Sequence, residues 1–112
     1  MDAAALVQMY GGGGNRLLFE NSSYPVTNVL VEYSMLPSPD GSSITFNCNY
    51  KITVNVPGVY DGISVAAKSF TISTENVDNL DKDTIADYIR QNTGNLTTSA
   101  GYTISLGDLL SY

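Results

Sequence analysis

The longest regular pattern in the sequence is an alternation of apolar and polar residues over positions 44–57. The apolar set comprises Ile44, Phe46, Cys48, Tyr50, Ile52, Val54 and Val56. The polar set between them comprises Thr45, Asn47, Asn49, Lys51, Thr53 and Asn55. Because successive side chains of a β-strand point to opposite faces of its sheet, this pattern predicts one long strand with an apolar face and a polar face.

The same alternation predicts a strand on each side of this segment. Residues 26–36 alternate in the same way, and the Asp-Gly turn signal within residues 37–43 predicts an antiparallel hairpin with the long strand. Residues 63–73 predict the next strand. The alternation of that strand changes phase part-way along, so we expect a β-bulge within residues 66–69.

The N-terminal segment predicts a β-hairpin. Two short apolar runs, residues 5–10 and 16–19, stand on either side of four consecutive glycines at positions 11–14. Glycine adopts positive φ at little cost, so a glycine-rich connection between apolar runs is typical of a turn between strands. A phosphate-binding loop is not indicated, because no Gly-Lys-Ser/Thr sequence follows.

The C-terminal region changes to the period of a helix. Apolar residues recur at helical spacing within residues 85–92, with Asp78 or Asp81 placed to cap the start and Gly94 placed to stop the end. This predicts an amphipathic helix of about 12 to 15 residues. The pattern of the tail is consistent either with a short second helix over residues 106–110 or with an extended end.

The composition is that of a folded chain with few charges. Its 112 residues correspond to one domain by the usual relation of length to domain count. Hydrophobic residues make up 43% of the chain and charged residues only 14%, which is well below the usual quarter. Because so few residues are charged, we expect partner subunits to cover much of the surface. No apolar run reaches the length of a membrane span, so we expect no membrane association.

The residue inventory excludes the common catalytic and metal centres. The chain has no histidine and one cysteine, Cys48, so it lacks Ser-His and Cys-His pairs and an ordinary zinc site. Cys48 belongs to the apolar set and is expected to be buried. The four aspartates within residues 78–87 lack the glycine and terminal glutamate of an EF-hand loop, and we attribute them to helix capping and a solvated helix face. We therefore expect no enzymatic activity, no metal and no cofactor.

The polar set of the long strand contains amides, hydroxyls and one lysine, but no carboxylate. It is either a solvated sheet face or a platform for a polar, anionic ligand. Residues 74–112 carry six carboxylates and two cations, and so hold −4 of the net charge of −6. The strand region is nearly neutral. Because the chain lacks the broad basic footprint of ordinary nucleic-acid binders, any binding of nucleic acid has to be local.

The order of these elements resembles that of the coat proteins of single-stranded RNA bacteriophages (levivirus-type). The resemblance spans nearly the whole chain: a glycine-turned hairpin, long antiparallel strands, a helix and a tail ending in tyrosine. Its most specific segment is residues 50–57, YKITVNVP, which is similar to the family's long strand with its Val-Pro end. The run FTI at residues 70–72 before an acidic helix start, and the hairpin at residues 6–18, are also similar.

The resemblance implies an α+β coat protein formed by residues 1–112 as a single domain. The implied architecture is an N-terminal β-hairpin, an antiparallel sheet of long strands, and a C-terminal helix or helices that pack on the partner subunit's sheet. Family members pair their sheets edge to edge as homodimers, and the dimers assemble into an icosahedral shell around the genome. The implied location is the virion, assembled in the cytoplasm of the bacterial host.

The resemblance also implies a site for RNA. In the family, the polar face of the sheet points into the shell and binds an RNA hairpin, which marks the genome for packaging and represses translation of the replicase. By their position before the Val-Pro end, Lys51 and Thr53 match RNA-facing family positions. The full expected set is Lys51, Thr53, Asn49, Asn55, Glu32 and Ser34.

Two other classes of function remain open from the sequence. A tail or head-completion protein of another phage type would share the β-rich, charge-poor character and would assemble into rings or tubes. A small-molecule-binding β domain would use the apolar face and the tyrosines as a pocket and would stay monomeric.

Overall fold

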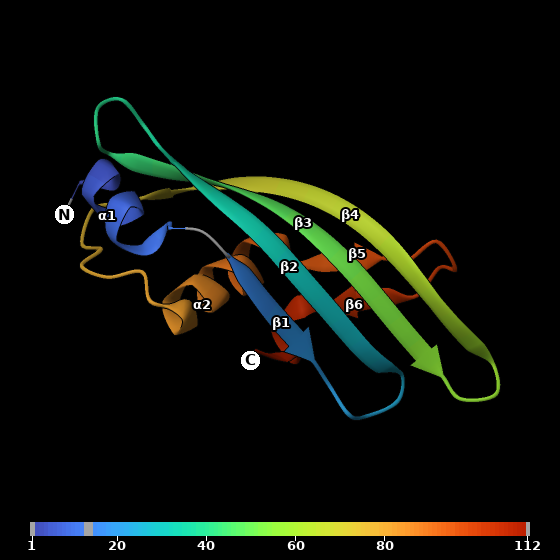
Figure 1. Ribbon diagram of the computed structural model, residues 1–112. Coiled ribbons are helices and arrows are strands. Elements are labelled where there is room, and N and C mark those ends of the chain that lie inside the picture. Colours follow the sequence, from blue (N-terminus) through green and yellow to red (C-terminus); the bar gives the residue numbers. More distant parts are fainter. Residues whose placement is uncertain (1, 13–14, 112) are drawn as a thin grey trace.

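The chain forms an α+β fold in which a five-stranded antiparallel sheet carries two helices (Figure 1). The computed structural model describes residues 2–12 and 15–111. The elements are α1 (Ala3–Tyr10), β1 (Arg16–Glu20), β2 (Val26–Pro37), β3 (Ser43–Val56), β4 (Tyr60–Ser73), α2 (Lys82–Thr93), β5 (Asn95–Thr97), β6 (Thr103–Ser105), the 3-10 turn η1 (Leu106–Asp108) and β7 (Leu110–Ser111). The strand order of the sheet is β4-β3-β2-β1-β7, and β5 and β6 form a separate two-stranded ribbon.

The predicted alternation of the central strands is confirmed. Every residue of the apolar set on β3 is buried, and each residue between them is half-buried or exposed. On β2, the odd-numbered residues from Thr27 to Met35 are buried in the same way. The predicted turn joins the two strands, which pair antiparallel from Pro37–Ile44 to Val26–Asn55.

The predicted bulge in β4 is wrong. β3 and β4 pair without interruption from Ser43–Ser73 to Val56–Tyr60. The phase change has another cause: Ile63 and Val65 occupy the face of the sheet opposite to that of Phe70 and Ile72, because the strand keeps a strict period of two.

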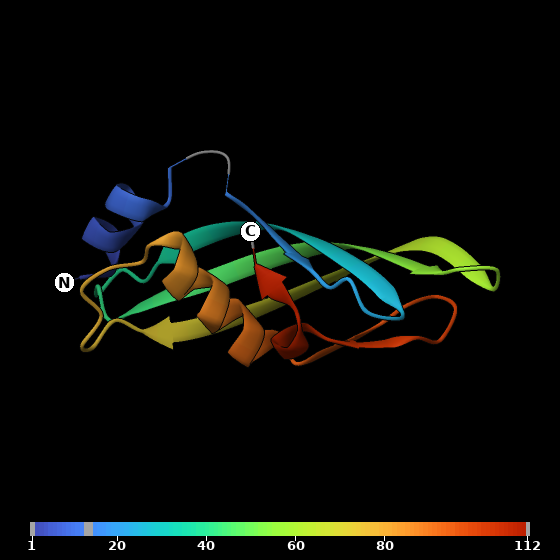
Figure 2. The ribbon, with the colours of Figure 1, turned by 90° about the horizontal axis from the view of Figure 1, so that it is seen from below.

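One face of the sheet, which we call the core face, is covered by α2 and by the β5–β6 ribbon (Figures 1 and 2). α2 buries Ile85, Ala86 and Ile89, and the ribbon buries Leu96 and Ile104 in the same core. α1 contacts β2 and β3 at the end of the sheet where β2 extends beyond β1. None of the helices formed by residues 2–12 and 15–111 lies over the opposite face, which we call the outer face.

The predicted N-terminal hairpin is wrong in its first half, because residues 3–10 form α1 rather than a strand. Asp2 caps this helix by accepting a hydrogen bond from the Ala5 amide over 2.9 Å, and the run AAALVQMY consists largely of good helix formers. The Ala3 amide donates to the Gly41 carbonyl over 3.0 Å and so attaches the helix to the β2–β3 turn. β1 does form a strand, and Gly13 and Gly14 of the predicted turn lie outside the described residues.

The predicted C-terminal helix is confirmed as α2, with Asp81 as its N-cap and Gly94, at φ +66°, after its last residue. α2 packs on the sheet of its own chain, and packing of a helix on a partner subunit's sheet stays a prediction. The Tyr50 hydroxyl is 2.6 Å from the Thr93 hydroxyl, and Lys68 donates to the Thr93 carbonyl over 2.9 Å. The end of α2 is therefore tied to β3 and β4 of the same subunit.

The tail combines the two predicted alternatives. It forms a short 3-10 turn at η1 and then the extended strand β7, which pairs with Phe19 and Glu20 of β1. Arg90 of α2 donates to the Leu109 carbonyl over 3.2 Å, and its guanidinium lies 5.1 Å from the centroid of the Phe19 ring. The tail thus covers part of the β1 edge.

Candidate nucleic-acid interface

All six residues predicted for RNA binding lie on the outer face. Thr53 is half-buried and the other five are exposed. The register of β2, β3 and β4 arranges the middle of this face in three adjacent cross-strand rows. The rows are Glu32–Asn49–Ala67, Leu30–Lys51–Val65 and Asn28–Thr53–Ile63. Because neighbouring residues in a row interact directly, the fold brings Glu32, Asn49, Lys51 and Thr53 into one continuous patch, which we call the central patch.

The two remaining predicted residues lie at the borders of the central patch. Ser34 faces Asn47 in the next row toward the β2–β3 turn, and Asn55 faces Val26 and Asp61 in the next row toward the opposite end. They share the outer face with the patch but are not part of its three rows.

Lys51 differs from every other cation of the chain. It makes no hydrogen bond or ion pair with any described residue. Lys68 and Lys82 donate to backbone carbonyls, Arg90 donates to Leu109 and pairs with Asp87, and Arg16 pairs with Glu32. Lys51 is therefore available to an anionic ligand on the outer face without loss of a contact to any described residue.

The two neutral polar residues of the central patch, Asn49 and Thr53, also have unpaired side chains. Neither Asn49 nor Thr53 forms a side-chain hydrogen bond with another described residue. Nearer the β2–β3 turn, in contrast, polar residues of β3 and β4 satisfy each other: Thr45 bonds to Thr71 over 3.0 Å, and Ser69 donates to Asn47 over 2.6 Å. The central patch thus presents donors and acceptors that only water or a ligand can satisfy.

The patch surrounds a shallow hollow of about 540 Å³. Apolar side chains of Leu30, Val65 and Ala67 line it together with Lys51 and Asn49. A second hollow of about 300 Å³ adjoins it and shares Asn49 and Ala67. The hollow thus combines apolar walls with the Lys51 cation, the Asn49 amide and the Glu32 carboxylate. Such a surface is chemically suited to a ligand with an anionic group for Lys51, a hydrogen-bond donor for Glu32 and a flat apolar part.

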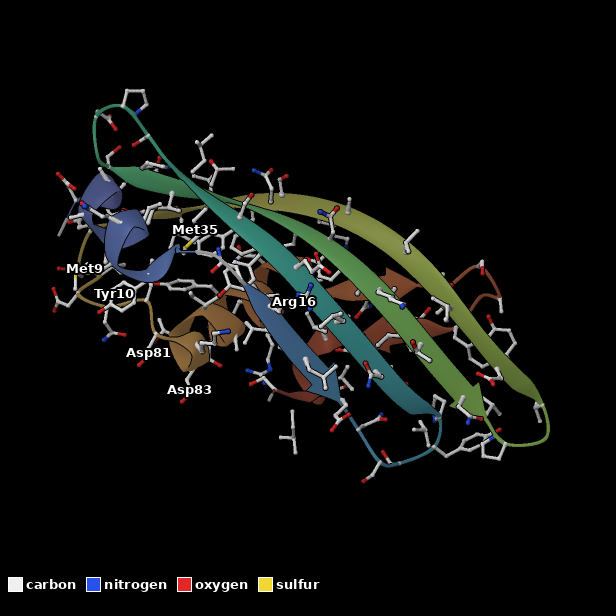
Figure 3. All side chains as sticks on the ribbon, in the orientation of Figure 1. Met9, Tyr10, Arg16, Met35, Asp81 and Asp83 are labelled. Atoms are coloured by element: carbon white, nitrogen blue, oxygen red, sulfur yellow. The ribbon has the colours of Figure 1, made fainter. Side chains whose placement is uncertain are left out.

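Sequence reasoning missed Arg16, which projects from β1 (Figure 3). The register of the sheet places it opposite Glu32 of β2. The Arg16 Nε and Glu32 Oε1 atoms are 4.0 Å apart, and the two side chains are 66% and 58% exposed. An exposed pair of this kind contributes little to stability and is screened by salt. Arg16 can thus exchange its carboxylate for a phosphate, which makes it a second cation within reach of the central patch.

Sequence reasoning also missed the apolar part of the site. Val65 is 81% exposed and Ile63 is 58% exposed. A strict period of two along β4 would have placed both on the outer face, whereas the expected bulge obscured that signal. Leu30 was placed on the correct face by the alternation of β2, but nothing in the sequence indicated that it lies beside Lys51.

Two titratable side chains, Tyr50 and Cys48, lie on the core face behind the patch. Burial raises the pKa of the Tyr50 phenol and of the Cys48 thiol, so both stay protonated at neutral pH.

In the part of the chain that the structure describes, no three His, Cys, Asp or Glu side chains are grouped so that they could hold a metal ion. No helix among residues 2–12 and 15–111 is long and apolar enough to cross a membrane.

Comparisons of the chain with protein-family models, with curated proteins and with solved structures found no match.

Proposed function

We propose that this chain is a viral coat protein that forms homodimers and then an icosahedral shell, and that its outer face binds a hairpin of the genomic RNA. The observation that carries the proposal is that one sheet combines an open fourteen-residue edge strand with an outer face on which Lys51, Asn49 and Thr53 have no side-chain partners among the described residues. The resemblance of element order to the coat proteins of single-stranded RNA bacteriophages supports the same assignment. The proposed location is the virion, assembled in the cytoplasm of a bacterial host.

Assembly is supported by the edges of the sheet. β4 is the last strand of the sheet on its side and pairs only with β3 along its length. An edge strand of this length is a template for pairing with another chain. At the other side of the sheet, β7 covers part of β1. A second copy that pairs with β4 would extend the sheet and place two outer faces on one surface.

RNA binding is supported by the chemistry of the central patch. Lys51, and Arg16 on the other side of Glu32, can contact phosphates, which supply most of the affinity in such complexes. Asn49 and Thr53 can bond to base edges or to ribose hydroxyls of unpaired nucleotides. Leu30 and Val65 offer apolar surface to a base. The proposed role is structural, with no enzymatic activity and no cofactor.

The hollow on the outer face also favours a second candidate, a small-molecule-binding β domain. Its volume of about 540 Å³ lies within the range of ligand pockets. This differs from the sequence-based version of the idea, which placed the pocket on the apolar face. A phage tail or head-completion protein is the further alternative, since it would use the same open edge.

Purified protein expressed without other viral components tests the assembly. We expect closed particles in electron micrographs, with nuclease-resistant RNA inside them. Rings or tubes would support the tail or head-completion alternative. A monomer at high concentration in light scattering would contradict the coat assignment and leave the small-molecule domain.

A further inference from the structure

The backbone of β4 presents one set of hydrogen-bonding groups to the open edge of the sheet. Beyond the last residue pair of the β3–β4 ladder, the Thr74 amide donates to the Ser42 carbonyl over 3.0 Å. Hydrogen-bonded and non-hydrogen-bonded pairs alternate along an antiparallel ladder. The even-numbered residues of β4 therefore bond to β3, and the odd-numbered residues direct their N–H and C=O groups outward. The outward residues are Asp61, Ile63, Val65, Ala67, Ser69, Thr71 and Ser73.

This alternation limits how two copies of β4 can pair. Two antiparallel copies of one strand are related by a two-fold axis, so each residue lies opposite the residue at the same distance beyond the axis. The outward N–H and C=O groups of the two copies can bond to each other only where an odd-numbered residue of one copy lies opposite an odd-numbered residue of the other. Two odd residue numbers have a whole number as their midpoint, so the two-fold axis lies at a residue position and not between two positions. The registers that pair nearly the whole of β4 place the axis at Ala66 or at Ala67.

Charge excludes the next register along the strand. An axis at Lys68 would place the two Lys68 side chains directly opposite each other on the core face, and like charges at opposed positions are destabilising. Lys68 is also already engaged, since it donates to the carbonyls of Thr93 and Asn95.

The side chains of the core face distinguish the two remaining registers. With the axis at Ala66, Tyr60 opposes the partner's Ile72 and Gly62 opposes the partner's Phe70, so apolar surface meets apolar surface. With the axis at Ala67, Ser64 would oppose an aromatic ring and Ala66 would oppose a lysine. Cross-strand apolar pairs are the more stable arrangement.

We propose that two subunits pair through β4 with Ala66 on the two-fold axis, so that Val65 of each subunit lies opposite the partner's Ala67. The proposal rests on the edge-to-edge dimer of the proposed function and specifies its register. Its consequence concerns the binding surface. Val65 and Ala67 line the hollow of the central patch, so the hollows of the two subunits meet at the axis and form one trough with Lys51 on each side.

Disulfide trapping tests this register in a Cys48→Ala background, which removes the native thiol. In the proposed register the two copies of residue 66 form a non-hydrogen-bonded pair with Cα atoms about 4.5 Å apart, a separation that a disulfide spans. We expect Ala66→Cys to form a covalent dimer on mild oxidation, seen on a non-reducing gel. Ala67→Cys is the matched control and should stay mostly uncrosslinked alone, but should form a dimer when mixed with Val65→Cys.

Each outcome decides between specific possibilities. Rapid crosslinking of Ala67→Cys alone, with Ala66→Cys unreactive, would move the axis to Ala67 and overturn the proposed register while leaving the coat assignment intact. Absence of every crosslink in protein that assembles into particles would exclude pairing through β4. Absence of crosslinks in protein that remains monomeric would instead contradict the proposed function itself. Circular dichroism establishes that each variant is folded, and the Val65→Cys with Ala67→Cys mixture tests the same register on the outer face.

Discussion

The two faces of the sheet treat their polar side chains in opposite ways. Lys68 of β4 faces the core side and donates both to the Thr93 carbonyl, over 2.9 Å, and to the Asn95 carbonyl, over 3.0 Å. Lys51 of β3 faces the outer side and has no partner among the described residues. Both are lysines on long neighbouring strands, so residue type does not explain the difference. The difference lies in what each face packs against, because the end of α2 and the start of β5 lie within reach of Lys68.

The core face is covered by other elements of the chain, and its buried polar side chains have hydrogen-bond partners. None of the buried side-chain nitrogen and oxygen atoms in the described part of the chain lacks a hydrogen-bond partner. On the outer face, Thr45 and Asn47 bond to β4 near the β2–β3 turn and Glu32 pairs with Arg16, but Lys51, Asn49 and Thr53 have no side-chain partner among the described residues. Residues of the core face thus have partners that contribute to stability, whereas Lys51, Asn49 and Thr53 of the central patch lack such partners and are the residues we propose for ligand binding. Two of the predictions below compare a core-face residue with an outer-face residue, and the others test individual contacts.

The largest expected effect is on the core face. Phe46 is fully buried, and its ring stacks on that of Phe70 with centroids 5.0 Å apart. Phe46→Ala should lower the free energy of unfolding by about 3–5 kcal/mol, because it removes buried surface and leaves a cavity. Thr45→Ala removes only an exposed hydrogen bond and should cost less than about 1 kcal/mol. Urea denaturation of both variants measures the difference, and equal costs would mean that the faces are assigned incorrectly.

A smaller effect is expected from a single buried hydroxyl. The Tyr50 and Thr93 hydroxyls are 2.6 Å apart in the core, so Tyr50→Phe leaves the threonine without its partner. We expect a loss of about 1–2 kcal/mol in the free energy of unfolding. Tyr33 is the control, because its hydroxyl forms no hydrogen bond with another described residue. A loss for Tyr33→Phe as large as that for Tyr50→Phe would contradict a specific role for the Tyr50–Thr93 bond.

The two lysines give the most direct comparison of stability between the faces. Lys68→Ala removes the cation at the C-terminal end of α2 and should cost about 1 kcal/mol of unfolding free energy. Lys51→Ala should leave the unfolding free energy unchanged within error, since no contact within the described chain is lost. Parallel urea titrations measure both values. A Lys51 variant as destabilised as the Lys68 variant would show that Lys51 has a structural partner.

The smallest expected effect concerns Asp40, a side chain that is exposed to solvent and yet has hydrogen-bond partners. Its carboxylate accepts hydrogen bonds from Ser38, which has the largest effect, and from Ser42, and these bonds lower the pKa of Asp40 to about 2. Because the folded-state pKa is below the unfolded value, the carboxylate stabilises the fold above the ordinary aspartate pKa of about 4, and this contribution is lost as pH falls through about 2. NMR titration of the carboxyl measures the pKa. Ser38→Ala should raise it toward the ordinary value, and an ordinary value in the unsubstituted chain would contradict the turn geometry.

Much of the fold follows from local sequence signals. The strict alternation on β2 and β3 fixed which side chains are buried, and the capping aspartate and the glycine at its end located α2. α1 was mispredicted because four glycines suggested a turn between strands. The helix depends on the Asp2 cap and on contact with Gly41, which is distant in sequence. Local periodicity contains no information about that contact.

The candidate site was predictable only within each strand. Alternation placed Lys51, Asn49 and Thr53 on one face, but it does not encode the register between strands. The positions of Arg16 and Val65 relative to Lys51 depend on that register, which arises from the β1–β2 and β3–β4 connections. The packing of α2 on its own sheet was likewise beyond sequence reasoning, because the same amphipathic helix fits either subunit's sheet.

The central claim is that Lys51 serves binding and not folding, and a titration of RNA with purified dimers tests it most directly. RNA recovered from assembled particles would be titrated by filter binding at two salt concentrations, with the unsubstituted protein and the Lys51→Ala variant. We predict weaker binding and a smaller salt dependence for the variant, because a phosphate contact is lost from each subunit, while particles still form. Unchanged affinity together with an unchanged salt dependence would contradict the claim and remove the central patch as the RNA site.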